Sequence, residues 1–233
     1  MAKQHRALRT RQELIRSASE VFYQVGFADS SINAISSRTG MSNGAVHFHF
    51  GNKRALGNAI ERAAARNLLC VTGRIPLRHP APLQHLVDTS HALARCLLND
   101  PVLRAGFGLG TDATWQGDGD LWEQWQDWVQ LMLTVARDQG SLAPDVCVED
   151  AVYAVTAVVA GVEVRARRDA AWCSRQAVTR FWRLMLPRLA SERVARSLVP
   201  EGTTTQAWPP GESGTDDLMP PGNPYDGADC GVA

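Results

Sequence analysis

The sequence of 233 residues lacks the features that mark secreted, membrane and disulfide-bonded proteins. It has no run of about eighteen consecutive apolar residues, so no transmembrane helix is predicted. The first residues, MAKQHRALRTRQE, have no apolar stretch behind their charges, so no secretory signal is predicted either. The five cysteines are odd in number and far apart, which argues against a disulfide framework. We therefore expect a cytoplasmic protein that does not contact a membrane.

Motifs of common enzyme classes are also missing. The sequence has no P-loop, dinucleotide-binding glycine fingerprint, nucleophile elbow or H-E-x-x-H motif. His47 and His49 are two positions apart, and on a helix such side chains diverge by about 200° instead of converging on one metal ion. We predict no metal and no cofactor, and a helical enzyme is kept only as a remote alternative.

The net charge of zero hides an uneven distribution along the chain. Residues 1–66 hold ten Lys and Arg against four acidic residues, and residues 67–199 hold fourteen of each. Residues 200–233 hold six acidic residues and no basic one. The basic N-terminal part is therefore where a polyanion such as nucleic acid is expected to bind.

Composition and periodicity divide the chain into three parts. No alternating β-branched pattern indicates a strand, whereas apolar residues recur at helical spacing, so an all-α protein of about nine helices is predicted. We expect a basic three-helix domain over residues 1–52 and a larger helical domain over residues 53–199. Residues 200–233 contain six Pro, six Gly and only acidic charge, and we expect this tail to be disordered.

Local signals mark three short helices near the N-terminus. A T-x-x-E capping box at Thr10 is expected to begin the first helix, and Gly26 is expected to end it. Ser31 and Ser42 are expected to cap the second and third helices, with Gly40 in the turn between them. Two short helices joined by a tight turn indicate a helix-turn-helix unit, and an ordinary helical hairpin is the alternative.

The helix-turn-helix interpretation divides the residues of this unit into buried and exposed sets. A shared core is expected from Ile32, Ile35, Ala45, Val46 and Phe48. The polar side of the third helix then fits the DNA major groove, and flanking basic residues neutralise phosphates. The predicted DNA-binding residues are Arg6, Arg9, Arg11, Ser31, Ser42, Asn43, Gly44, His47 and Lys53.

Residues 8–66 resemble the DNA-binding domain of the TetR family of transcriptional repressors. The shared stretches include I-S-x-x-T-G-M-S at residues 35–42, G-A-V-H-F-H-F at residues 44–50 and Lys53-x-x-Leu56. The second stretch, together with D-P-V-L-R-A-G at residues 100–106, is similar to the γ-butyrolactone receptors that control antibiotic production. These relatives commonly have Lys where this chain has Asn43 and Tyr where it has His47, so no operator sequence is carried over.

The resemblance implies a function for each part of the chain, with a helix-turn-helix DNA-binding domain over residues 1–52 and a helical effector-binding and dimerisation domain over residues 53–199. Proteins of this kind are dimeric repressors that bind palindromic double-stranded operator DNA and leave it when a small-molecule effector binds. A γ-butyrolactone-type signal that regulates secondary-metabolite genes is the effector that the resemblance favours. A pseudo-receptor or an efflux regulator that senses an antibiotic is the alternative, and the sequence does not decide between them.

Three tryptophans follow one another at helical spacing. Trp122, Trp125 and Trp128 are i, i+3 neighbours, so their rings are expected along one side of a helix. Such a stripe is usually core packing, although flat aromatic walls also suit a pocket for an apolar ligand. In the receptor branch a Trp at about this place lines the effector pocket, and Trp125 is its match. The predicted effector-binding residues are Trp125, Trp122, Trp128, Leu103 and Phe107.

The last two long helices have more apolar surface than one small domain needs. They are expected at residues 149–167 and 171–199, and Pro187 should kink or split the second one. In TetR-like proteins the corresponding pair forms a four-helix bundle across a two-fold axis. A homodimer through these helices is therefore predicted, and a pair buried within one subunit is the alternative.

Overall fold

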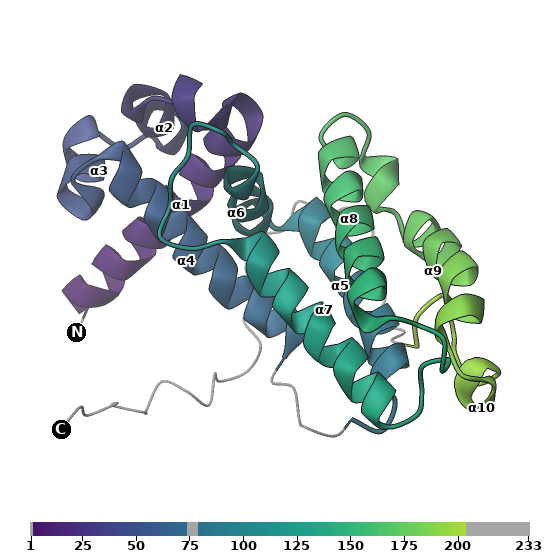
Figure 1. Cartoon of the computed structure of the whole chain (residues 1–233). Helices are drawn as coiled ribbons and strands as arrows, with labels where there is room; N and C mark the ends of the chain where they lie inside the picture. Colours follow the sequence, from purple (N-terminus) through teal and green to yellow (C-terminus); the bar gives the residue numbers. More distant parts are fainter. Residues whose placement is uncertain (1, 74–78, 204–233) are drawn as a thin grey trace.

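The computed structural model describes residues 2–73 and 79–203, and this part of the chain is all-helical (Figure 1). It contains ten α-helices, one short 3-10 helix and no strand, which confirms the predicted all-α fold. Apart from its first four residues, the acidic tail that was expected to be disordered lies outside the described residues. No helix in the described ranges is both long and apolar enough to cross a bilayer.

The N-terminal helices form a head at one end of the molecule (Figure 1). They are α1 (Ala2–Asp29), α2 (Ile32–Thr39) and α3 (Asn43–Phe50), and α4 (Lys53–Thr72) runs from this head into the larger part. The prediction that the first helix begins at Thr10 was wrong. The residues before Thr10 are mostly good helix formers such as Ala, Lys, Gln, Leu and Arg, so nothing interrupts the helix there. Gly26, at φ 80°, kinks α1, and the helix continues for one further turn to Asp29.

The remaining helices build the larger part of the molecule. They are α5 (Pro82–Asn99), α6 (Pro101–Gly110), α7 (Leu121–Asp138), α8 (Val148–Ala166), α9 (Arg175–Leu189) and α10 (Glu192–Ala195), with the 3-10 helix η1 (Ala170–Cys173) before α9. The loop expected from Gly108 begins only after α6 ends at Gly110. The last segment divides around Ser174 and Ala190, while Pro187 lies inside the final turn of α9. α9 continues through Pro187 to Leu189, so the segment is not split at this residue.

Two apolar cores meet along α4 and α6. Leu56 and Ile60 of α4 belong to the core of the head, and Leu68 of the same helix belongs to the core of the larger part. On α6, Leu109 faces the head and Phe107 faces the other core. The predicted boundary between residues 52 and 53 therefore lies at the start of a helix that packs in both cores. α4 therefore connects the two cores directly.

Candidate nucleic-acid interface and effector groove

Short-range hydrogen bonds set the geometry of α2 and α3. The Ser31 hydroxyl accepts a hydrogen bond from the Ala34 amide at 3.1 Å, and the Ser42 hydroxyl accepts one from the Ala45 amide at 3.2 Å. Gly40 closes α2 at φ 65°, a left-handed conformation that suits glycine. Both serines were predicted as DNA-binding residues, and in this structure their hydroxyls cap helices.

The outer side of α3 combines polar and aromatic groups. Asn43, Gly44 and His47 are exposed, as their predicted DNA contacts require. Phe48 is 85% exposed, so its predicted place in the core was wrong. Val46 and Phe50, which are four positions apart and therefore share one side of the helix, are buried instead. Phe48 lies between them in sequence and points away, so α3 presents an aromatic ring beside its polar groups.

Hydrogen bonds orient two of the polar side chains on α3. The Asn43 amide nitrogen donates to the side-chain oxygen of Asn33 on α2. The His47 Nδ1 donates to the Gly51 carbonyl at 2.8 Å. The other ring nitrogen, Nε2, takes no part in this bond. Both side chains therefore have a preferred orientation before any ligand binds.

The predicted arginines lie on the first turns of α1. Arg6 is exposed, and Arg9 forms an exposed ion pair with Glu13 at 3.2 Å, a type of contact that adds little stability. The guanidinium of Arg11 lies 5.0 Å from the centre of the Phe50 ring. This cation–π contact joins the first turns of α1 to the end of α3.

Lys53 has a structural role in addition to its predicted DNA contact. Its ammonium donates to the carbonyls of Phe27, Ala28 and Ser30 at 2.8, 3.1 and 2.9 Å. These carbonyls lie at the C-terminal end of α1, where a positive charge is favourable. All three donors of the ammonium are thus occupied, and a phosphate contact by Lys53 has to replace one of these bonds.

The loop between α6 and α7, residues 111–120, runs across α4 and reaches the end of α1 (Figure 1). We call it the strap. Arg54 on α4 donates to the Gln116 carbonyl at 2.5 Å, and Asn58 donates to the Asp118 carboxylate at 2.7 Å. At the other end of the strap, the carboxylate of Asp112 accepts from the Phe27 amide at 2.7 Å. The strap therefore joins the head to the larger part through two helices.

Trp115 is the centre of the strap. Its ring packs edge-on against Phe27 with 4.6 Å between centroids, and its Nε1 donates to Glu61 at 2.6 Å. The ring lies directly over Gly57 of α4, where a Cβ would overlap it. A glycine inside a helix is usually unfavourable, and here it lets the indole ring approach the helix backbone.

Burial raises the pKa of Glu61 above its ordinary value of 4.5, although the hydrogen bond from Trp115 opposes this shift. A raised carboxyl pKa means that the folded state binds the proton more tightly than the unfolded state does. Stability therefore falls as the pH rises from about 4.5 through the pKa of the folded state.

We expect Glu61→Gln to weaken this pH dependence, because an amide does not ionise and its oxygen still accepts from Trp115. Urea denaturation of both proteins between pH 4 and pH 8 measures the difference. Exposed Glu13, replaced by Gln, is the matched control and should leave the pH profile of the wild type unchanged. Parallel pH profiles for wild type and Glu61→Gln would contradict the assignment.

The stretch at residues 100–106 joins α6 to α4 and α1. Asp100 caps α6 by accepting from the amides of Val102 and Leu103 at 2.8 and 3.2 Å, and its second oxygen accepts from Asn67 of α4 at 2.7 Å. Gly106 permits close packing of α6 on α4, because a Cβ there would overlap Ala64.

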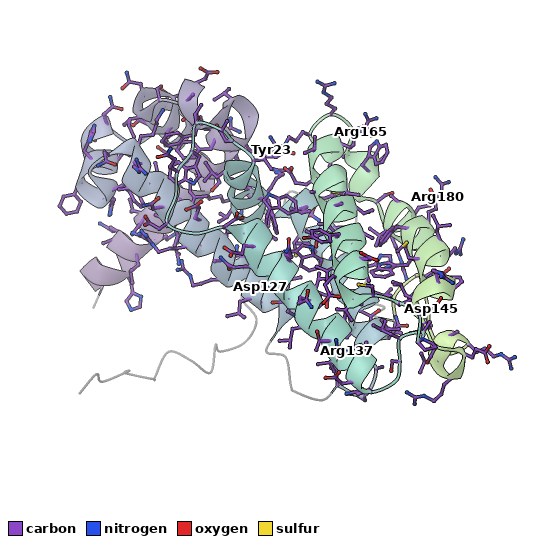
Figure 2. The ribbon with its side chains drawn as sticks, in the orientation of Figure 1. Tyr23, Asp127, Arg137, Asp145, Arg165 and Arg180 are labelled. Atoms are coloured by element: carbon purple, nitrogen blue, oxygen red, sulfur yellow. The ribbon has the colours of Figure 1, made fainter. Side chains whose placement is uncertain are left out.

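Further along α6, the guanidinium of Arg104 lies 4.5 Å from the centre of the Tyr23 ring on α1. Figure 2 shows Tyr23 between the head and the larger part. The stretch at residues 100–106 is thus part of the contact between the head and the rest of the protein.

Two of the predicted effector-binding residues lie beside an open groove between α4 and α7. Trp128 lines this groove, which has a volume of about 590 Å³, together with Leu68 and Thr72 of α4 and Asp127 (labelled in Figure 2). Trp125 is buried behind Trp128, with the two rings stacked at 5.2 Å between centroids. Neither indole N–H has a hydrogen-bond partner among the described residues.

The other predicted effector-binding residues are packed in the core. Leu103 and Phe107 are fully buried, and neither lines the groove between α4 and α7. The Phe107 carbonyl accepts from Trp122 Nε1 at 3.1 Å, and the two rings pack edge to face. Trp122 therefore has a partner for its indole N–H, whereas Trp125 and Trp128 do not.

Comparisons with known proteins agree on one kind of protein. Residues 14–60 match the bacterial regulatory proteins of the tetR family. The A-factor receptor protein of Streptomyces griseus is 28% identical over 204 residues, which are 87% of this chain and 71% of that protein. These matches include both the head and most of the larger part.

Solved structures show the same fold. The crystal structure of a gamma-butyrolactone receptor (ArpA-like protein) is 24% identical, with a TM-score of 0.72 over 84% of this chain and 96% of that one. The structure of CprB from Streptomyces coelicolor in complex with its operator sequence is 22% identical, with a TM-score of 0.70 over 82% of this chain and 94% of that one.

Proposed function

The chain belongs to the tetR family of bacterial regulatory proteins, and from this premise we propose that it is a dimeric, effector-responsive repressor of transcription. The exposed side of α3 is the observation that carries the proposal. It offers an amide, an imidazole and an aromatic ring on a short helix that is capped by Ser42 and flanked by basic turns. A regulator that binds bacterial operator DNA acts in the cytoplasm, and we propose no catalytic role.

Each exposed group on α3 has a counterpart in the DNA major groove. Asn43 can form two hydrogen bonds with an adenine edge once it leaves Asn33, and Phe48 can cover a thymine methyl group. His47 and the arginines of α1 supply donors to phosphates, which position the head without reading sequence. We propose that this chain reads A·T pairs within each half-site of its operator.

We expect Phe48→Ala to weaken operator binding about tenfold, because removing the ring loses its contact with a base. The fold should not change, since the ring touches little of the protein. Fluorescence anisotropy with labelled duplex DNA from upstream of the gene measures the affinity. Val25→Ala removes a half-exposed apolar side chain from α1 in the same domain and is the control. Equal affinities of Phe48→Ala and wild type would contradict the reading role of Phe48.

A two-fold dimer supplies the second head that a palindrome requires. Half-sites are separated by about 34–36 Å or its multiples, so one head reaches only one of them. On α8 the exposed positions include the small residues Ala157 and Gly161 and the apolar residue Val164. On α9 the large apolar residue Leu184 is exposed. We propose that these two sides pair with their copies in a four-helix bundle.

The effector is proposed to bind in the groove between α4 and α7. A γ-butyrolactone combines an apolar chain with carbonyl oxygens, which suits the aromatic wall and the two unpartnered indole donors of Trp125 and Trp128. Both indole nitrogens are buried, so their N–H groups become accessible only when the two stacked rings move.

The position of the groove also explains how effector binding would change DNA binding. It lies at the C-terminal end of α4, whereas the head packs on the N-terminal half of this helix, whose 20 residues span about 30 Å in all. An effector that displaces the end of α4 therefore moves the head and changes the separation of the two recognition helices. A coupling free energy of about 1–3 kcal/mol per site is typical of such switches.

A further inference from the structure

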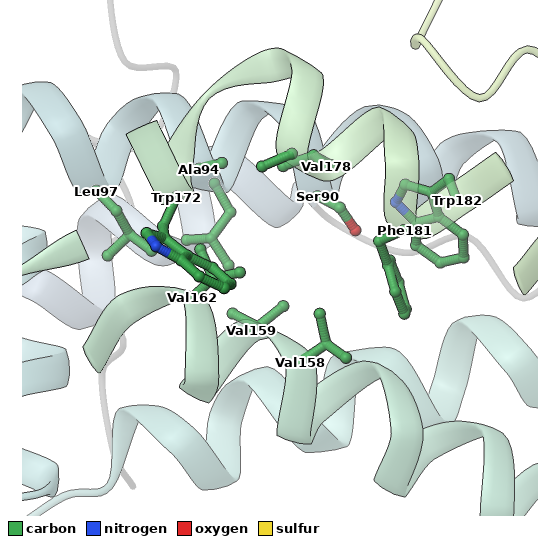
Figure 3. A pocket seen from close by; sticks show the side chains of 12 residues that line it. Ser90, Ala94, Leu97, Val158, Val159, Val162, Trp172, Val178, Phe181 and Trp182 are labelled. Atoms are coloured by element: carbon green, nitrogen blue, oxygen red, sulfur yellow. The ribbon is translucent and has the colours of Figure 1, made fainter. Parts of the chain in front are cut away.

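A second cavity lies apart from the groove between α4 and α7. It has a volume of about 170 Å³ and lies between α5, α8, η1 and α9 (Figure 3). None of its lining residues comes from α4 or α7. Apolar side chains line it almost entirely, including Leu93, Ala94, Val159 and Phe181.

Trp182 provides a polar group in these apolar surroundings. Its side chain is fully buried, lines the cavity, and has an Nε1 without a hydrogen-bond partner. Figure 3 shows this nitrogen on the side of the ring that faces Ser90 and the cavity. The Ser90 hydroxyl donates its own proton to the Leu86 carbonyl at 2.7 Å, so its remaining capacity is that of an acceptor.

This space is small and almost entirely apolar. Apolar cavities of about 150 Å³ remain dry and take up molecules such as benzene. The cavity here is of that size, and the polar groups of its lining include the unpartnered N–H of Trp182 and the Ser90 hydroxyl. Its chemistry therefore suits a small apolar molecule with a single acceptor oxygen.

The side chain of Trp172 separates the cavity from the solvent on one side. Trp172 of η1 lines the cavity and is partly exposed, and the guanidinium of Arg165 lies 4.7 Å from the centre of its ring. Arg165 is labelled at the end of α8 in Figure 2. A short 3-10 segment moves more easily than a long helix, so η1 is the expected entry path.

We propose that this cavity is a second ligand site, which takes a small aromatic or branched aliphatic molecule whose carbonyl or ether oxygen accepts a hydrogen bond from Trp182 Nε1. Such a molecule fills the space between α8 and α9. Because the proposed dimer uses the outer sides of these two helices, the ligand also holds the bundle in one arrangement. That consequence rests on the proposed function, whereas the binding itself does not.

Two probes of nearly the same shape test the site in the full-length protein. Acetophenone carries a carbonyl oxygen, and α-methylstyrene carries a CH₂ group in its place. Calorimetric titration of the wild type should show saturable binding of both probes, with acetophenone about three- to tenfold tighter, because only acetophenone accepts a hydrogen bond.

Three variants locate the binding. Trp182→Phe should remove the preference for acetophenone and leave the affinity for α-methylstyrene nearly unchanged. Ala94→Leu adds carbon atoms on the α5 side of the cavity and should abolish binding of both probes. Tyr153→Phe removes a polar atom from an exposed ring on α8 and should change neither affinity.

Thermal unfolding of each variant separates a filled cavity from a damaged fold. The proposal is overturned if neither probe binds saturably, if both bind the wild type equally, or if Trp182→Phe retains the preference for acetophenone. These titrations contain no DNA, so their failure would leave the proposed repressor function unaffected.

Discussion

Leu184→Glu is expected to convert the protein into a folded monomer that no longer holds its operator. Leu184 is 77% exposed on α9, so a carboxylate there touches only water in a single subunit, and the free energy of unfolding of the subunit should not change appreciably. In the proposed four-helix bundle the same charge is buried without a partner, which costs several kcal/mol.

The loss of operator affinity follows from the loss of the dimer. Two linked heads bind a palindrome as one unit, and linkage typically raises the affinity by about 10²–10⁴. We therefore expect operator affinity to fall at least about 100-fold. Analytical ultracentrifugation measures the mass, and anisotropy with the full palindrome measures the affinity.

Val25→Glu is the control for the oligomeric state. It places the same charge at a half-exposed apolar position on α1, outside the helices of the proposed dimer face, and should leave the mass unchanged. A Leu184→Glu protein that sediments like the wild type and binds the palindrome equally well would refute the proposed dimer face.

Trp115→Ala is the second change with a large expected effect. It removes a nearly buried indole from contact with Phe27 and Gly57 and leaves the carboxyl group of Glu61 without its hydrogen-bond donor. Truncation of a buried Trp usually costs about 3–5 kcal/mol. We expect a loss of this size in chemical denaturation, together with weaker coupling between effector and DNA.

Two milder variants divide this effect into its parts. Trp115→Phe keeps most of the ring but removes the N–H, so its cost should be about 1–3 kcal/mol from the unpaired carboxyl group. Gly57→Ala normally stabilises a helix by about 1 kcal/mol, but here the added methyl group collides with the ring and should destabilise the protein. A stabilised Gly57→Ala protein would show that the strap does not lie on α4.

Features that depend on neighbouring residues could be predicted from the sequence. Ser31, Gly40 and Ser42 form caps and a turn within a few residues, so their roles follow from local chemistry. The exposure of Phe48 also follows from the local sequence, because Val46 and Phe50 are four residues apart and share one side of α3. Phe48 was assigned to the core because it is hydrophobic, although the helical period places it outside.

The strap could not be predicted because its contacts join distant residues. Trp115 and Glu61 are 54 positions apart, and Asp112 and Phe27 are 85 positions apart. The sequence held two weak signals: a glycine at position 57 inside a helical stretch, and a tryptophan within a loop otherwise rich in glycine and aspartate. The spacing of Trp122, Trp125 and Trp128 predicted a helix face, but only the fold shows which N–H groups lack a partner.

Release of DNA by an effector is the measurement that tests the central claim most directly. The full-length protein is bound to duplex DNA from upstream of its own gene and titrated first with γ-butyrolactones and then with antibiotics. The account predicts a specific complex that a butyrolactone dissociates, and it predicts that Trp125→Phe keeps the complex but requires more ligand for release. Release by an antibiotic alone would support the repressor function and would show that the effector is an antibiotic instead of a butyrolactone. A specific complex that no ligand dissociates, or no specific complex at low salt, would contradict the account.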